Sequence, residues 1–187
     1  MSDADPQVTA LLARFVLETK IEAIPENVRR EGIRSLVNII GCALGGSRHD
    51  AVNKAWTALQ PFAGGAQVTL IGRSQRTDAL TAAFINTLSC STNAFDDTHA
   101  EAIVHPSGPV AGASFAIAGA SGIGGAEVLT TFVGATELTC RIGLAAVGQF
   151  HRSGFQPTAI LGPFGAAFAA AASCLRARST RLAIAKA

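Results

Sequence analysis

The chain has 187 residues, a mass of 19.1 kDa and a formal net charge of +2. Hydrophobic residues make up 49% of the chain and charged residues 15%, against roughly 25% charged residues in an average soluble domain. This composition excludes a disordered chain, and the small net charge argues against a protein whose main function is to bind nucleic acid. Low charge, sparse aromatics and 19 glycines predict close-packed helices that are partly covered, in an oligomer or in a larger protein.

The first part of the chain shows helical periodicity. Apolar residues three and four positions apart predict an amphipathic helix over residues 6–20, and Pro25 opens a second helix that stops at Gly45 and Gly46. The apolar stripe expected on this second helix comprises Val28, Ile33, Leu36, Val37, Ile40 and Leu44. Residues 51–59 predict a short helix, and residues 67–71 form the one convincing strand-like run.

The second part is also helical and rich in small residues. Thr77 is the expected N-cap of a helix that runs to about residue 93, and a polar loop follows. Further helices are predicted over residues 109–121 and 126–149, the latter with Glu137 and Arg141 paired, and from Pro163 onward. One strand among about seven helices predicts an all-α fold, which we treat as one helical domain over residues 1–187.

Neither a membrane span nor a metal site is expected. Two stretches of about 20 residues lack charge, but prolines, glycines and alanines fill them, which favours buried helices of a soluble protein. The polar, acidic N-terminus is not a signal peptide, and the four cysteines are too far apart for metal or redox motifs. Free thiols in a cytoplasmic protein are therefore expected.

The strongest chemical signal is a polar cluster in an otherwise uncharged region. Asp96, Asp97, Thr98 and His99 are followed by Glu101 and His105. Carboxylates beside an imidazole suit proton transfer, with their pKa values tuned by burial. An exposed acidic turn that caps a helix is an equally good interpretation, and a metal site is a weaker one because no strong ligand template is matched.

Two other segments carry weaker signals. Residues 119–125 resemble the glycine loop of a dinucleotide site, but the strand that should precede it is doubtful, and a tight turn between helices is the better interpretation. Residues 151–158 could bring Arg152, Gln156 and Thr158 to a pocket, with Arg152 facing a carboxylate, or could be an ordinary polar connection.

At DDTH and HPSG the chain resembles the MmgE/PrpD family, which includes 2-methylcitrate dehydratase, cis-aconitate decarboxylase and iminodisuccinate epimerase. The similarity extends over nearly the whole chain. Further matching segments, in the same order, are IPENVRREGIRSLVNIIGCALGGS, QVTLIGRSQRTDALTAAFINTLSCSTNAFDDTH, RIG and GFQPTAILGPFGAAFAAA. Several motifs in this order are far more specific than any one of them.

The resemblance implies the N-terminal part of an all-α domain that forms homodimers. It also implies cofactor-free lyase or epimerase chemistry on small polycarboxylates, by proton transfer at a carbon next to a carboxylate. By motif, Asp96, Asp97 and His105 are the expected catalytic residues, with Asp97 and His105 carrying the proton transfer. Thr98, Gln156 and Arg152 are the expected substrate-binding residues.

Three departures from the family pattern bear on activity. The family usually has an acid where this chain has Ala94, and often a histidine where it has Gln156. Family members also continue beyond this length with a lysine, further histidines and a lid domain, so the chain is expected to be a fragment or a truncated form. The first hypothesis is thus the N-terminal domain of a polycarboxylate lyase. The alternative is a non-catalytic helical module that acts as a subunit or dimerisation partner, and a nucleotide-binding domain is a weak third.

Overall fold

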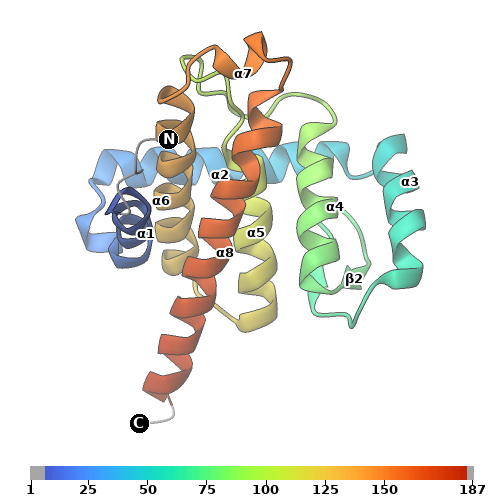
Figure 1. Ribbon diagram of the computed structural model, residues 1–187. Coiled ribbons are helices and arrows are strands. Elements are labelled where there is room, and N and C mark those ends of the chain that lie inside the picture. The colour runs from blue at the N-terminus through green and yellow to red at the C-terminus, as the bar shows by residue number, and fades with distance from the viewer. Residues whose placement is uncertain (1–6, 185–187) are drawn as a thin grey trace.

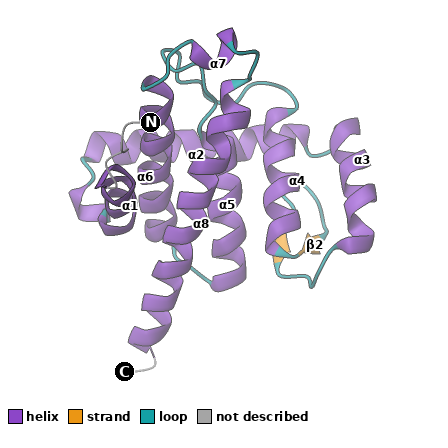
Figure 2. Ribbon diagram, viewed as in Figure 1, coloured by secondary structure: helices purple, strands orange, loops and turns teal. Residues whose placement is uncertain are grey.

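The computed structural model describes residues 7–184 and is all-α, as predicted (Figures 1 and 2). Its helices are α1 (Gln7–Glu18), α2 (Glu26–Gly46), α3 (Asp50–Leu59), α4 (Ala79–Ser91), α5 (Ser107–Ser121), α6 (Gly125–Leu144), α7 (Gln149–Arg152) and α8 (Pro157–Ile184). Two short 3₁₀ turns, η1 (Ile21–Ala23) and η2 (Gln60–Phe62), lie between helices. Strands β1 (Val68–Thr69) and β2 (Arg76–Thr77) form a small antiparallel hairpin.

Four helices lie side by side, and one crosses them. In Figure 1 the axes of α4, α5, α8 and α6 are roughly parallel, with α4 and α6 running opposite to α5 and α8, and α2 passes behind them. The most extensive helix contacts join α8 to α5 and α6, and α4 to α5 and α2. Residues 157–178 of α8 are long and apolar enough to cross a membrane, and the same helix packs on α5 and α6.

The predicted packing of small residues is confirmed. A Cβ atom added at Gly46 of α2 would lie 1.9 Å from the carbonyl oxygen of Ser89 in α4. At Gly165 of α8 it would lie 2.2 Å from the hydroxyl of Thr139 in α6. The helices therefore approach so closely that only glycine fits at these crossings.

The buried face of α2 differs from the predicted stripe. Gly32, Ile39 and Ala43 are buried, whereas Ile33 and Val37, which we expected in the stripe, are 51% and 64% exposed. Small residues let α2 pack closely against α4, α5 and α6, so its larger apolar side chains remain on the outer face.

Several helix boundaries also differ from the predictions. Asp78, not Thr77, caps α4, and its Oδ1 accepts hydrogen bonds from the amides of Leu80 and Thr81 at 3.0 Å. The helix predicted over residues 126–149 ends at Leu144, five residues before the predicted end. The helix predicted from Pro163 begins at Pro157, so Pro163 lies inside α8. Because proline can begin a helix without loss of a hydrogen bond, Pro157 is the start signal that the prediction missed.

The glycine loop is a turn between two helices. Residues 109–121, which would have to supply a strand for a dinucleotide site, belong to α5. Gly122 ends this helix with a φ of +72°, a left-handed conformation that glycine adopts without strain, and α6 begins at Gly125. The nucleotide-binding hypothesis is therefore wrong.

Candidate functional site

The polar cluster lies on the loop between α4 and α5, at the end of the bundle that also carries α7 (Figure 1). An isolated β-bridge shapes this loop: the amide of His99 donates to the carbonyl of Val104 at 2.9 Å, and the reverse bond measures 3.4 Å. Ile103 closes the turn with a positive φ of 51°. The bridge brings the two ends of the motif, DDTH and HPSG, next to each other.

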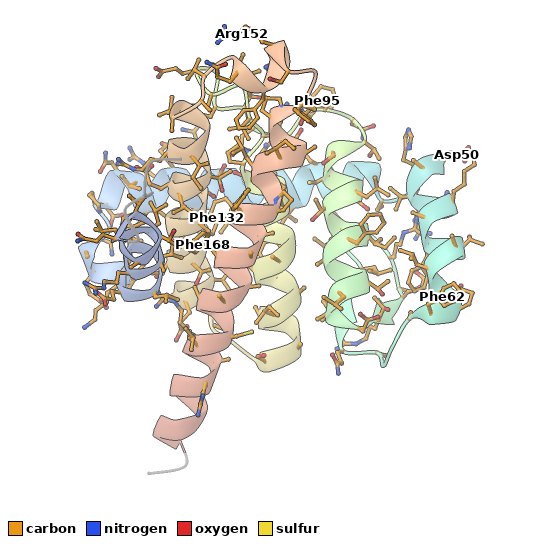
Figure 3. The ribbon with its side chains drawn as sticks, viewed as in Figure 1. Asp50, Phe62, Phe95, Phe132, Arg152 and Phe168 are labelled. Carbon is orange, nitrogen blue, oxygen red and sulfur yellow. The ribbon has the colours of Figure 1, made fainter. Side chains whose placement is uncertain are left out.

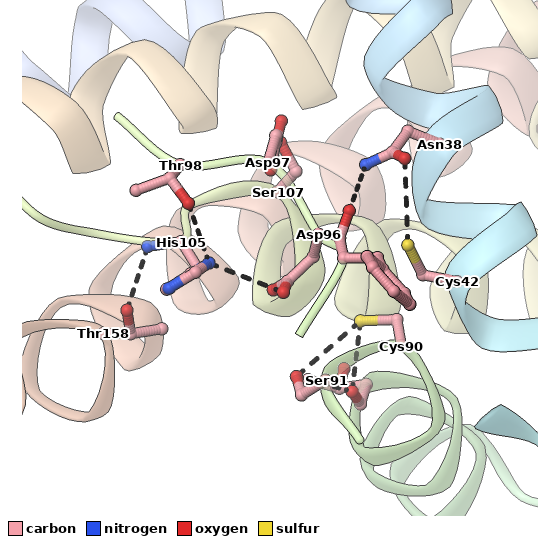
Figure 4. Close-up of polar contacts among 12 residues, drawn as sticks. Asn38, Cys42, Cys90, Ser91, Asp96, Asp97, Thr98, His105, Ser107 and Thr158 are labelled. Carbon is pink, nitrogen blue, oxygen red and sulfur yellow. Dashed lines mark hydrogen bonds and ion pairs between the residues drawn. The ribbon is translucent and has the colours of Figure 1, made fainter. Parts of the chain in front are cut away.

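The side chains of Asp96 and Thr98 converge on one ring nitrogen of His105, Nδ1 (Figure 4). Oδ1 of Asp96 lies 3.5 Å from Nδ1 of His105, and the hydroxyl of Thr98 lies 3.3 Å from the same nitrogen. The side chain of Asp96 is only 6% exposed, whereas that of His105 is 33% exposed. Because Nδ1 faces these two partners, Nε2 is the ring nitrogen left to meet a molecule from solvent.

The electrostatics of this group suit proton transfer. Burial raises the pKa of the Asp96 carboxyl, and the charge of Asp97 raises it further, while His105 partly offsets the shift. An acid with a raised pKa holds its proton closer to neutral pH and can exchange it with an adjacent imidazole. The pair can therefore hold, give or take one proton at the surface of the bundle.

Asp97 has a different environment from its neighbour. Its Oδ2 accepts hydrogen bonds from the hydroxyls of Ser35 on α2 and Ser107 at the start of α5. Its Oδ1 is buried and has no hydrogen-bond partner among the described residues. We expected Asp97 to share the proton transfer with His105, which stays a prediction, and its contacts in the structure tie the loop to α2 and α5.

Two further contacts hold the loop in place. The backbone amide of His105 donates to the hydroxyl of Thr158, in the first turn of α8, at 2.9 Å. The side-chain amide of Asn38 on α2 donates to the carbonyl of Phe95 at 3.3 Å. Helices far apart in the sequence thus fix the backbone on both sides of the Asp96–His105 pair.

The other two predicted binding residues, Arg152 and Gln156, lie on α7 and in the connection that leads from it to α8. Oε1 of Gln156 accepts a hydrogen bond from the amide of Ala159 at 2.8 Å and so caps α8. Arg152 lies on α7 at the tip of the molecule (Figure 3). Within the described part of the chain, neither side chain makes a polar contact with Asp96 or His105.

The cysteines near the cluster are not activated nucleophiles. Burial raises the pKa of Cys90 to about 11, and burial together with Asp96 and Asp97 raises the pKa of Cys42. Both thiols are free and stay protonated near neutral pH. Among the residues that the structure describes, no three His, Cys, Asp or Glu side chains lie close enough together to hold a metal ion.

The comparison with family models identifies the chain. The sequence model of the MmgE/PrpD N-terminal domain matches residues 10–187, which is nearly all of it. The chain therefore belongs to the MmgE/PrpD family and corresponds to its N-terminal domain, as the motifs indicated. No curated protein matches the sequence.

Sequence reasoning missed the serines that hold Asp97. Ser107 stands inside the HPSG motif and gave a weak signal, but Ser35 lies 62 residues before Asp97 in an ordinary helix. Only the packing of α2 across the bundle brings it to the loop. Thr158 was identified within its segment, but its bond to the His105 backbone depends on where α8 begins.

Proposed function

We propose that this chain is the N-terminal domain of a cofactor-independent lyase or epimerase that acts on a small polycarboxylate, with 2-methylcitrate dehydratase as the nearest reaction type. The observation that carries the proposal is the Asp96–His105 pair, with Thr98 at the same ring nitrogen. Removing a proton next to a carboxylate needs a positioned base, and the partly exposed ring of His105 can supply one.

In this proposal the two aspartates have separate roles. His105 takes or gives the proton through Nε2, and Asp96 orients the ring and stabilises its charge. Thr98 offers a hydroxyl to the substrate, and Asp97 holds the loop through Ser35 and Ser107. Arg152 and Gln156 remain candidates for binding the outer carboxylates of the substrate, and four free cysteines agree with a cytoplasmic enzyme.

Proton exchange tests this directly. The chain is incubated in D₂O with citrate, 2-methylcitrate, cis-aconitate or iminodisuccinate, and loss of the carbon-bound proton is followed by NMR. We expect exchange with at least one acid, and a loss of at least roughly tenfold in rate for His105→Ala. His151→Ala is the matched control, because His151 is an exposed histidine on α7 outside the cluster.

Two outcomes would contradict the proposal. Exchange that is equal in wild type and His105→Ala would remove His105 from the chemistry. Absence of both exchange and binding with all four acids would favour the second candidate function, a non-catalytic helical subunit.

One observation supports this second candidate. The outer face of α2 exposes Ile33, Val37 and Leu44, which are spaced four and seven residues apart and so form one stripe. Exposed apolar stripes mark protein interfaces, and we propose that a second copy of this chain covers this one. Val37→Glu should convert the dimer to a monomer in analytical ultracentrifugation. Lys54→Glu, at an exposed residue of α3, should leave the dimer intact. A wild-type monomer would refute the dimer.

A further inference from the structure

A hollow lies between α2 and α6, beside the 96–105 loop. Its volume is about 410 Å³, within the range of small-molecule sites. Glu31 and Ser35 line it from α2, and His99 lines it from the loop. Asp96, Thr98 and His105 are not among its lining residues, so it is a separate site from the proton-transfer pair.

The walls are mainly apolar. Val28, Phe132, Val133 and Leu144 line the hollow, and Phe132 is fully buried. The α2 and α6 residues that line it recur at helical spacing, so one continuous face of each helix forms a wall. A ligand that fits this space has a compact apolar body.

The inner polar atoms are acceptors. The hydroxyl of Ser35 donates a hydrogen bond to Asp97, so toward the hollow its oxygen can act only as an acceptor. Oδ1 of Asp97, on the carboxylate that Ser35 contacts, has no hydrogen-bond partner among the described residues, and neither does the buried hydroxyl of Thr136 in the α6 wall.

The charge of Asp97 acts on α6 as well as on α2. The charge of Asp97 contributes to the raised pKa of the Cys140 thiol, which lines the hollow from α6, after the larger effects of burial and Glu137. A buried charge with an unsatisfied oxygen favours a positive group nearby, because the interior screens the field weakly.

The rim adds two more carboxylates. Glu31 pairs with Arg34 at 3.0 Å, and Glu137 with Arg141 at 2.6 Å. All four side chains are well exposed, and such ion pairs contribute little, so each carboxylate can also receive a ligand's N–H group. The lining itself thus carries two carboxylates, Glu31 and Glu137, and one arginine, Arg141.

We propose that the α2–α6 hollow binds a small organic ammonium, a primary amine on a compact apolar body. The ammonium donates to Ser35 and Glu31, beside the field of Asp97, and the apolar body packs against Phe132 and Val133. This site does not depend on the proposed polycarboxylate chemistry, which involves a ligand of opposite charge at His105.

The test compares three probes that share one apolar body. Phenethylamine, 2-phenylethanol and 3-phenylpropanoate are titrated into the full chain, and backbone amide shifts are followed by ¹H–¹⁵N NMR. Phenethylamine is expected to saturate at millimolar concentration with shifts on the facing sides of α2 and α6. The alcohol should bind more weakly, and the carboxylate should not bind there.

Matched variants locate the binding. Glu31→Gln should weaken the binding of phenethylamine by roughly three- to tenfold, and the isosteric Thr136→Val should weaken it by roughly threefold. Glu22→Gln, an exposed glutamate outside the hollow, and His105→Ala should leave the dissociation constant unchanged. Three results would each overturn the proposal. They are binding of the carboxylate probe at α2 and α6, no saturable shift with phenethylamine, and wild-type affinity for phenethylamine in both Glu31→Gln and Thr136→Val.

Discussion

The buried carboxylate of Asp96 lies 3.5 Å from Nδ1 of His105, while the adjacent residue, Asp97, turns its carboxylate to Ser35 and Ser107. Two consecutive aspartates thus have opposite environments. Asp96 is buried beside an ionisable ring, and Asp97 is held by hydroxyl donors. Replacing Asp96 and removing a hydrogen-bond donor to Asp97 should therefore change stability in opposite directions.

Asp96→Asn is expected to stabilise the fold near neutral pH. Because burial raises the pKa of Asp96 above its ordinary 3.8, the native state holds a proton that the unfolded state has already released. The free energy of unfolding of the wild type therefore falls as pH rises from about 3.8 through the folded pKa, and the amide variant lacks this loss. Urea unfolding at several pH values checks the difference, which should vanish in acid. A wild type more stable than the variant at neutral pH would mean that the His105 contact outweighs burial.

Ser107→Ala should destabilise the fold. Ser107 is fully buried, and its hydroxyl is one of two donors to Oδ2 of Asp97. Removing it leaves a buried carboxylate short of a partner, at a cost of about 1–3 kcal/mol. Urea unfolding measures the loss. Ser91→Ala is the control, because the exposed Ser91 hydroxyl donates only within its own helix, to the carbonyl of Thr87, and its loss should cost less than about 0.5 kcal/mol.

The cap of α4 predicts the opposite pH dependence from Asp96. Hydrogen bonds from the amides of Thr81 and Gly64 hold the pKa of Asp78 well below its ordinary 3.8. Asp78→Ala should lower the free energy of unfolding by about 1 kcal/mol at pH values above 3.8. The loss should shrink as the pH falls below 3.8, because protonation of Asp78 then weakens the same bonds in the wild type. Thermal unfolding from neutral to acidic pH tests this. Asp50→Ala, at an exposed residue that pairs only with Lys54, should cost less at every pH.

Two glycines of α2 offer a matched test of the close packing. Gly46→Ala should cost at least about 3 kcal/mol, because the new methyl group would overlap the Ser89 carbonyl of α4. Gly41→Ala, on the same helix with no atom within 4 Å of the added methyl group, should stabilise by about 0.5–1 kcal/mol. Equal effects in chemical denaturation would show that α2 does not approach α4 so closely.

Ala94 combines a strained backbone with a position at which the family resemblance led us to expect an acid. Its φ of +52° is costly for alanine and easier for Asp or Asn. Both Ala94→Asp and Ala94→Asn should therefore raise the melting temperature slightly. Only Ala94→Asp adds a carboxyl group beside Asp96, and we expect it to speed polycarboxylate proton exchange at least roughly tenfold. Equal exchange rates in the two variants would exclude a role for an acid at this position.

The sequence was sufficient for the fold class, and its motifs for the family. Periodic apolar residues and caps located the helices, because these signals are local. The buried face of α2 was missed for the opposite reason. Which face packs depends on where glycines allow another helix to approach, and neither Gly32 nor Gly46 reveals its partner in the sequence.

The candidate site was predicted in part for the same reason. Asp96, Thr98 and His105 are close in sequence, and their clustering is confirmed by the structure. Ser35 and Thr158 come from helices on opposite sides of the loop, and only the assembled bundle brings them near it. Arg152 and Gln156 matched a pattern but lie outside the cluster, because Gln156 is used as a helix cap.

The guanidinium of Arg176 on α8 donates to the carbonyl of Thr19, at the end of α1, across 157 residues at 2.7 Å. α1 also packs against α6 and α8, and Val16 is its buried residue. During synthesis the first helix can meet α6 early, but its packing is complete only after Arg176 has left the ribosome. The opening segment is a late-closing part of the fold, and chaperones that bind exposed apolar helices have their longest opportunity there.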